Sequence, residues 1–182
     1  MAQRVGIIGS GAWGTAIAKL LAEKGHDVLL WARRREVLDA INTDHRLPVH
    51  LPGVQLPQAL RASGDIAEVA SRRYIVLATP SLHVVEFAKR IIAVPNVLEG
   101  ESVIGVVTKG VVQQGKSYRL ILEALESYLP GSYKGNLVYL SGPTHAEEVA
   151  SGKLTGMISA SANPRNSIRF RELLSTRWLL VY

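Results

Sequence analysis

The sequence predicts an α/β fold with a mainly parallel, doubly wound sheet. Short apolar runs, such as residues 4–8 and 74–78, have the length and composition of strands that are buried on both faces of a parallel sheet. These runs alternate with segments whose apolar residues recur at helical spacing. Because right-handed crossovers join strands and helices that alternate in this way, the strands are expected to lie parallel, with helices on both faces.

The first strand, turn, helix and second strand follow one another closely. After the strand at residues 4–8 comes a glycine-rich turn at residues 9–14, and a helix is expected over about residues 13–24. Gly25 is the expected end of this helix, since glycine readily adopts the left-handed conformation that follows many helices. Residues 27–31 predict the second strand.

The rest of the chain continues the alternation. A helix is expected over residues 34–41, and the prolines and the glycine between residues 48 and 57 predict an irregular loop. There is no internal repeat and no convincing linker, so residues 1–182 are expected to form one domain. Further strands are expected at residues 74–78, 102–107, 137–140, 156–160 and 178–182, and further helices at residues 66–71, 81–92, 117–128, 144–150 and 164–174.

Composition narrows the class of protein. With 47% hydrophobic and 20% charged residues, the 182-residue chain can bury a substantial core. It has no cysteine, which excludes disulfides, thiolate metal sites and thiol nucleophiles. The N-terminus lacks the pattern of a targeting peptide, and no apolar stretch approaches the ~18 residues of a membrane span. We therefore expect a soluble, cytoplasmic protein.

Charge and histidine content give weaker indications of function. The formal net charge of +6 favours anionic ligands, which include dinucleotides and phosphorylated metabolites as well as nucleic acid. The basic residues are spread along the chain, so nothing specifically indicates a nucleic-acid partner. The five histidines show no metal-ligand spacing, and we expect no metal site.

The glycine-rich turn carries the clearest functional signal. Gly9, Gly11 and Gly14 form a G-x-G-x-x-G motif that follows a strand and opens a helix, which is the context that a dinucleotide-binding Rossmann fold requires. In that fold the first glycine permits the tight turn, the second admits the pyrophosphate and the third lets helix and strand pack closely. The alternative is a purely structural turn without a ligand.

Residues after the second strand indicate which dinucleotide is bound. NAD sites usually carry an acidic residue there, whereas this chain has Arg33, Arg34 and Arg35. Guanidinium groups suit the 2′-phosphate of NADP, and we assign that role to Arg33. The alternative, a solvated group that opens a surface helix, is preferred for Arg35.

Two later strands end in polar residues at the same predicted edge of the sheet. Lys109 follows the strand at residues 102–107, where it can neutralise a substrate phosphate or polarise a carbonyl, although a lysine there is also commonly a solvated charge. Gly142 and Thr144 follow the strand at residues 137–140. The alternative for Thr144 is an N-cap, with Glu147 completing a capping box.

Taken together, these motifs resemble bacterial NAD(P)-dependent glycerol-3-phosphate dehydrogenase. The resemblance runs in order from residue 5 to the end of the chain, and it implies hydride transfer between NAD or NADP and the pair sn-glycerol 3-phosphate and dihydroxyacetone phosphate, in phospholipid biosynthesis. The segments that carry it are residues 9–16, 30–33, 50–53, 108–110 and 141–149.

The resemblance also implies roles for individual residues. Lys109 would contact both cofactor and substrate, and it is the candidate catalytic residue. His50 stands where the family often has tyrosine, and His145 where phenylalanine is usual, so the packing of rings over the ligand is expected to differ. The implied cofactor contacts are Ala12, Trp13, Arg33, Arg34, His50, Lys109 and Ala146, and the implied substrate contacts are Lys109, Gly142 and Thr144.

The family has a second, helical domain that supplies the general-base lysine and grips the substrate phosphate, and a homodimer is possible for the whole enzyme. These 182 residues contain no counterpart of that domain, so the chain is expected to be truncated before it and to be inactive alone. Two other functions stay open. One is the Rossmann half of another dehydrogenase, acting on a hydroxy acid or ketopantoate, and the other is a non-catalytic NAD(P)-binding sensor.

Overall fold

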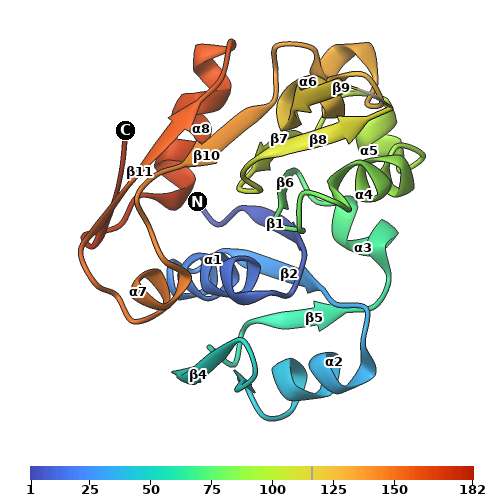
Figure 1. The fold of residues 1–182 in the computed structure, drawn as a ribbon. Coiled ribbons are helices and arrows are strands. Elements are labelled where there is room, and N and C mark those ends of the chain that lie inside the picture. The colour runs from blue at the N-terminus through green and yellow to red at the C-terminus, as the bar shows by residue number, and fades with distance from the viewer. Residues whose placement is uncertain (116) are drawn as a thin grey trace.

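The computed structural model, which describes residues 1–115 and 117–182, confirms a mainly parallel α/β fold with an eight-stranded sheet (Figure 1). The strand order is β12-β11-β10-β7-β6-β1-β2-β5. From β1 the chain builds outward to β2 and β5 on one side and to β6, β7 and β10 on the other, so the order reverses between β1 and β6. In open α/β sheets ligands bind at such a reversal, beyond the carboxyl ends of the strands. The strands of this sheet are β1 (Arg4–Ile8), β2 (Asp27–Trp31), β5 (Arg61–Ser63), β6 (Tyr74–Leu77), β7 (Val103–Val106), β10 (Val138–Ser141), β11 (Thr155–Ala160) and β12 (Leu179–Val181).

Helices cover both faces of the sheet (Figure 1). Alternate residues of β1 belong to different cores: Ile7 packs in the cluster that includes residues of α1, α7 and α8, and Ile8 in the cluster that includes residues of α3, α4 and α6. Burial on both faces explains why the central strands are almost entirely apolar. The helices are α1 (Ala12–Glu23), α2 (Arg35–Asn42), α3 (Ile66–Ala70), α4 (Val84–Ile91), α5 (Pro95–Leu98), α6 (Ile121–Glu126), α7 (Ala146–Ala150) and α8 (Pro164–Leu174).

Across the sheet, every pair of neighbouring strands from β5 at one edge to β10 is parallel. The pairing of β10 with β11 is antiparallel. Ile7 of β1 lies opposite Leu30 on one side and Val76 on the other. Ser141 of β10 lies opposite Ile158 of the antiparallel strand β11, which in turn pairs in parallel with β12. The carboxyl ends of β1, β2, β6, β7 and β10 therefore share one edge.

Gly25 ends helix α1 as expected. Its φ is +84°, its N–H donates to the Ala22 carbonyl at 3.0 Å, and the N–H of His26 donates to the Leu21 carbonyl at 3.1 Å. These two bonds form a Schellman motif, which satisfies carbonyls left free at the end of the helix.

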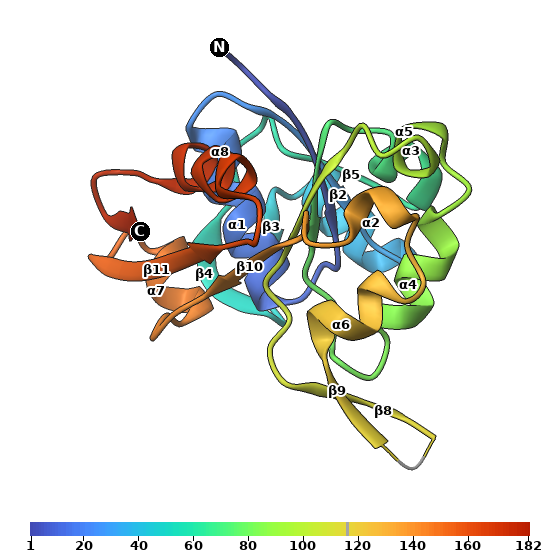
Figure 2. The same ribbon diagram turned by 90° about the horizontal axis from the view of Figure 1, so that it is seen from above.

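The expected helix at residues 117–128 is wrong in its first four residues. Ser117–Leu120 form β9, which pairs antiparallel with β8 (Val111–Gln114), and α6 starts only at Ile121. Figure 2 shows this hairpin projecting from the rest of the molecule. Leu120 fits the apolar spacing of the helix but is 60% exposed, whereas Ile121 and Leu125 are buried. Local spacing therefore gave a correct helix with a wrong start.

The region of residues 46–63, expected as an irregular loop as far as residue 57, contains three short strands. β3 (Arg46–Leu47) and β4 (Leu51–Gln55) form a separate antiparallel pair, and β5 adds an edge strand beside β2. Pro52 is compatible with β4 because a two-stranded pair leaves one edge of each strand free. The prolines and the glycine of this region therefore do not prevent the formation of short strands.

His26 is expected to make stability depend on pH. Its half-buried ring accepts a hydrogen bond at Nδ1 from the N–H of Gln3, 3.2 Å away, and burial, with the nearby charges of Lys24 and the N-terminus, lowers the pKa of His26 below its ordinary value of 6.5. The unfolded chain therefore takes up a proton first as the pH falls. The neutral ring therefore contributes its full stabilisation above pH 6.5. This stabilisation is lost as the pH falls from 6.5 through the lower pKa that His26 has in the folded chain.

We expect the free energy of unfolding in urea to fall more between pH 8 and pH 5 for the wild-type chain than for His26→Gln, whose amide oxygen can still accept the bond from Gln3. Parallel pH profiles for the two proteins would show that His26 does not contribute this dependence.

Candidate functional site

Two glycines of the motif, Gly9 in the turn after β1 and Gly14 in the first turn of α1, are required by backbone packing. Gly9 has φ of +122°, and a Cβ on it would lie 2.5 Å from the carbonyl oxygen of Ala78. A Cβ on Gly14 would lie 1.8 Å from the carbonyl oxygen of Gly9. Both distances are far below van der Waals contact, so these glycines let the turn, the helix and β6 approach closely.

Gly11 has a different environment. Its φ of −73° is open to any residue, and a Cβ built on it meets nothing within 4 Å. Packing within the chain therefore does not explain this glycine. The open space lies in front of the first turn of α1, where backbone N–H groups have no intrahelical acceptor and the helix dipole is positive. Such a space fits an anionic group that approaches the backbone, as a pyrophosphate does.

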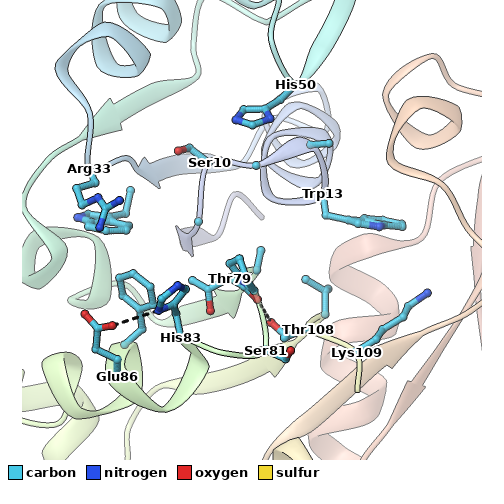
Figure 3. A pocket seen from close by; sticks show the side chains of 18 of the residues that line it. Ser10, Trp13, Arg33, His50, Thr79, Ser81, His83, Glu86, Thr108 and Lys109 are labelled. Carbon is cyan, nitrogen blue, oxygen red and sulfur yellow. Dashed lines mark hydrogen bonds and ion pairs between the residues drawn. The ribbon is translucent and has the colours of Figure 1, made fainter. Parts of the chain in front are cut away.

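A cavity of 720 Å³ lies over this turn at the carboxyl edge of the sheet (Figure 3). Its volume is within the range of ~300–1,000 Å³ typical of small-molecule and cofactor sites. The walls come from the β1–α1 turn, the end of β2 and the segment after it, His50 between β3 and β4, the segment from the end of β6 into α4, and the segment after β7. Eight residues predicted from sequence line it: Gly9, Gly11, Ala12, Trp13, Arg33, Arg34, His50 and Lys109.

The other predicted residues do not line the cavity. Gly14 is buried beneath the turn, and Ala146 is buried in the core cluster that also contains residues of α1. The carbonyl oxygen of Gly142 lies within hydrogen-bond distance of the Nζ of Lys109, and Thr144 follows two residues later. The roles assigned to all these residues stay predictions.

One end of the cavity is rich in arginine. Arg33 and Arg34 are exposed, and within residues 1–115 and 117–182 neither forms an ion pair with a carboxylate. Arg35 instead pairs with Asp39 one turn along α2, with 3.1 Å between Nε and Oδ1. The contact of Arg35 supports its interpretation as a surface helix residue, and it leaves two unpaired guanidinium groups at the cavity.

Lys109 occupies the opposite end, across the turn from Arg33 (Figure 3). Its Nζ donates a hydrogen bond to the carbonyl oxygen of Gly142 at 2.8 Å and lies 5.9 Å from the centroid of the Trp13 ring. A Cβ on Gly142 would lie 2.7 Å from the carbonyl of Gly156, so this glycine also lets the segment after β10 approach β11. The fold thus brings together Lys109, Trp13 and Gly142, which are far apart in sequence.

The capping-box alternative for Thr144 is wrong. Helix α7 begins at Ala146 with His145 as its N-cap, so Thr144 lies one residue too early to cap it and Glu147 one residue too early to complete the box. Thr144 is 5% exposed, and its hydroxyl finds no hydrogen-bond partner within the described part of the chain. A buried hydroxyl without a partner is uncommon and calls for another explanation than capping.

Sequence reasoning missed one wall of the cavity. The segment after β6 and the helix α4 form a wall of the cavity that no motif marked, although the Thr79-Pro80 ending of the strand at residues 74–78 indicated a loop at that edge. The cavity-lining residues of this wall are Thr79, Pro80, Ser81, His83, Glu86, Phe87 and Arg90.

Within the part of the chain that the structure describes, acidic and histidine side chains do not gather in any group of three or more that could hold a metal ion. No helix in residues 1–115 and 117–182 is long and apolar enough to cross a bilayer.

Comparison with known proteins identifies the family. A family model described as the N-terminus of NAD-dependent glycerol-3-phosphate dehydrogenase matches residues 4–167. The chain belongs to this family. This membership agrees with the glycine turn, the cavity and the fold described above.

Relatives in the glycerol-3-phosphate dehydrogenase family match the whole chain. The chain is 47% identical to glycerol-3-phosphate dehydrogenase [NAD(P)+] of Treponema pallidum, over 98% of this chain and 53% of the relative, and 43% identical to that of Treponema denticola, over 100% and 53%. The crystal structure of glycerol-3-phosphate dehydrogenase from Coxiella burnetii superposes with a TM-score of 0.87 at 28% identity, covering 100% of this chain and 53% of that one. The chain therefore spans about half the length of the relatives it matches.

Proposed function

We propose that residues 1–182 are the dinucleotide-binding domain of an oxidoreductase that interconverts sn-glycerol 3-phosphate and dihydroxyacetone phosphate with NADP or NAD. The observation that carries this proposal is the open space at Gly11, in a cavity with arginines at one end and Lys109 at the other. Family membership supports the same substrate pair.

The glycine turn would hold the pyrophosphate. The free N–H groups at the start of α1 face the open space at Gly11, and the positive end of the helix dipole favours phosphate there. Ala12, Trp13 and His50 border the same cavity and would contact the cofactor around the pyrophosphate. When bound, the nicotinamide supplies or accepts the hydride.

The Lys109 end would receive the substrate. An ammonium group there can polarise the carbonyl that accepts the hydride, or neutralise the substrate phosphate. Gly142 accepts a hydrogen bond from Lys109, and the unpartnered hydroxyl of Thr144 follows two residues later. We place Lys109, Gly142 and Thr144 at the substrate for these reasons, with Lys109 as the catalytic residue and Ala146 beside the cofactor.

Arg33 is expected to set the cofactor preference. If its unpaired guanidinium grips the 2′-phosphate, the wild-type chain binds NADPH about tenfold more tightly than NADH, or ~1.4 kcal/mol, since solvent screening reduces charge-assisted bonds that are worth ~1.5–3 kcal/mol when shielded. Arg33→Asp should reverse the preference, because a carboxylate repels the 2′-phosphate and accepts hydrogen bonds from the ribose hydroxyl of NADH. Fluorescence titration with both cofactors at low and high salt measures the preference.

Arg35→Asp is the matched control, since it makes the same change in net charge two residues away, outside the cavity-lining set. The ratio of the NADPH and NADH affinities should stay within about twofold of the wild type, because salt screens the interaction of this more distant charge with the 2′-phosphate. Equal weakening of NADH and NADPH by Arg33→Asp would mean that Arg33 supports the fold or the adenine, and the 2′-phosphate role would be dropped.

The substrate is tested by joining this chain to the second half of the 47% identical Treponema pallidum relative. We expect the fusion to oxidise NADPH in the presence of dihydroxyacetone phosphate and to leave ketopantoate and other 2-oxo acids unreduced. Reduction of a 2-oxo acid instead would assign the chain to another dehydrogenase. If the fusion binds NADPH tightly but reduces no carbonyl compound, the result would favour the non-catalytic NAD(P)-binding sensor.

A further inference from the structure

Three side chains at the arginine end of the cavity form a cluster that no sequence motif predicted: Trp31, Phe87 and Arg90. The rings of Trp31 and Phe87 meet edge to face, with 4.9 Å between centroids. The Cζ of Arg90 lies 5.1 Å from the Trp31 centroid and 5.4 Å from the Phe87 centroid. Both distances are within the range of ~6 Å for attraction between a cation and an aromatic ring.

Arg90 is exposed, and its charge is not neutralised by a nearby carboxylate. Within residues 1–115 and 117–182 it forms no ion pair, and its contacts are with the two aromatic rings. Glu86, the acidic residue of the same wall, lies instead 3.4 Å from Nδ1 of His83 (Figure 3). The guanidinium is therefore oriented by aromatic contacts and faces a cavity that it helps to line.

The cluster lies at a defined end of the proposed cofactor site. Trp31 is the last residue of β2 and precedes Arg33 by two positions, so the cluster belongs to the Arg33 end of the cavity. Figure 3 shows that Arg33 and Lys109 lie at opposite ends. With the pyrophosphate at the glycine turn and the nicotinamide toward Lys109, the Trp31 end receives the adenosine. This placement rests on the function proposed above.

We infer that Arg90 is a cofactor-binding residue that stacks on the adenine ring of the dinucleotide. A guanidinium is planar and weakly hydrated, and it stacks well on aromatic faces, including those of nucleobases. The contacts with Trp31 and Phe87 restrict the side chain before the cofactor arrives, so less conformational freedom is lost on binding. Adenine is common to NAD and NADP, so Arg90 contributes equally to both, whereas Arg33 acts on the 2′-phosphate alone.

The test is titration of NADH, NADPH and 5′-AMP into the 182-residue chain and three variants. Arg90→Ala should weaken all three ligands about tenfold, the effect expected for removing one stacking partner of a base. Arg90→Lys keeps the charge and loses the plane, so it should weaken them nearly as much. The control is Lys89→Ala on the same helix, whose Nζ lies 4.4 Å from the centroid of the Tyr128 ring and which is not a cavity-lining residue. It should bind all three ligands like the wild type.

Each other result overturns the inference. Weakening confined to NADPH would make Arg90 a ligand of the 2′-phosphate, and wild-type affinity in Arg90→Lys would show that only its charge matters. Wild-type affinity in Arg90→Ala, with an unchanged thermal midpoint, would exclude any role. A wild-type chain that binds neither dinucleotide contradicts the proposed function itself and the role of Arg90 with it.

Discussion

Gly11→Val is expected to abolish dinucleotide binding while the chain keeps its fold. The backbone at Gly11 has a φ that valine adopts freely, and its Cβ position is open. The methyl groups would then fill the space in front of the free N–H groups of α1. Losing two charge-assisted hydrogen bonds to the pyrophosphate, at ~1.5–3 kcal/mol each, weakens binding at least about a hundredfold. Quenching of Trp13 and Trp31, both of which line the cavity, measures affinity, and circular dichroism checks the fold.

Two other glycines provide controls. Gly131 also has open space at its Cβ but lies outside the cavity, so Gly131→Val should bind like the wild type. Gly14→Ala should lose the fold as well as the ligand, since its Cβ would overlap the carbonyl of Gly9 and overpacking typically costs ~1–3 kcal/mol or more. Unchanged affinity in Gly11→Val would mean that the turn is only structural.

The 182-residue chain alone is expected to reduce dihydroxyacetone phosphate at least about 10⁴-fold more slowly than ordinary enzymes, whose turnover clusters near ~10 s⁻¹. Hydride addition to a carbonyl requires a proton for the new hydroxyl, and loss of a positioned acid or base costs ~10²–10⁴ in rate. Loss of the surface that orients the substrate adds to this cost. The family resemblance assigns the general-base lysine and the phosphate grip to the second, helical half.

Steady-state oxidation of NADPH by the isolated chain, with the Treponema fusion as positive control, measures this difference. Turnover by the isolated chain within about tenfold of ~10 s⁻¹ would contradict the prediction. Lys109→Met would then show whether Lys109, the ammonium group at the substrate end, supplies the proton.

The parts of the site that depend on local sequence could be predicted. Gly9, Gly11 and Gly14 occupy one turn, and the strand before it and the helix after it are each set by a short stretch of sequence. Glycine spacing alone cannot separate their roles, because the need for Gly9 arises from Ala78, which follows the distant strand β6. Of these three glycines, only Gly11 faces open space, and the sequence does not reveal this difference.

The parts that depend on strand order could be predicted only in part. That Lys109 and Gly142 meet follows from two strands ending at one edge, and the hydrogen bond between them agrees with it. The wall that includes Phe87 and Arg90 was missed because sequence does not reveal that β6 lies beside β1. Its residues show ordinary helical spacing, and only the tertiary arrangement turns them toward the glycine turn.

Errors in element boundaries had a consequence at Thr144. If α7 began one residue earlier, Thr144 would be its N-cap. Because α7 begins at Ala146, Thr144 is instead a buried residue whose hydroxyl has no partner among the described residues. The spacing of Thr144 and Glu147 fits both interpretations. The geometry of the backbone decides against the helix cap, and the substrate role of Thr144 stays a prediction.

Binding of the pyrophosphate at the Gly9–Gly14 turn is tested most directly by following the backbone amide resonances of the chain during titration with NADPH. The free N–H groups at the start of α1 are expected to shift most, at Gly11, Ala12 and Trp13, with smaller shifts near Arg33 and Lys109. Saturable binding that leaves these three amides unshifted and perturbs another surface would contradict the proposed site.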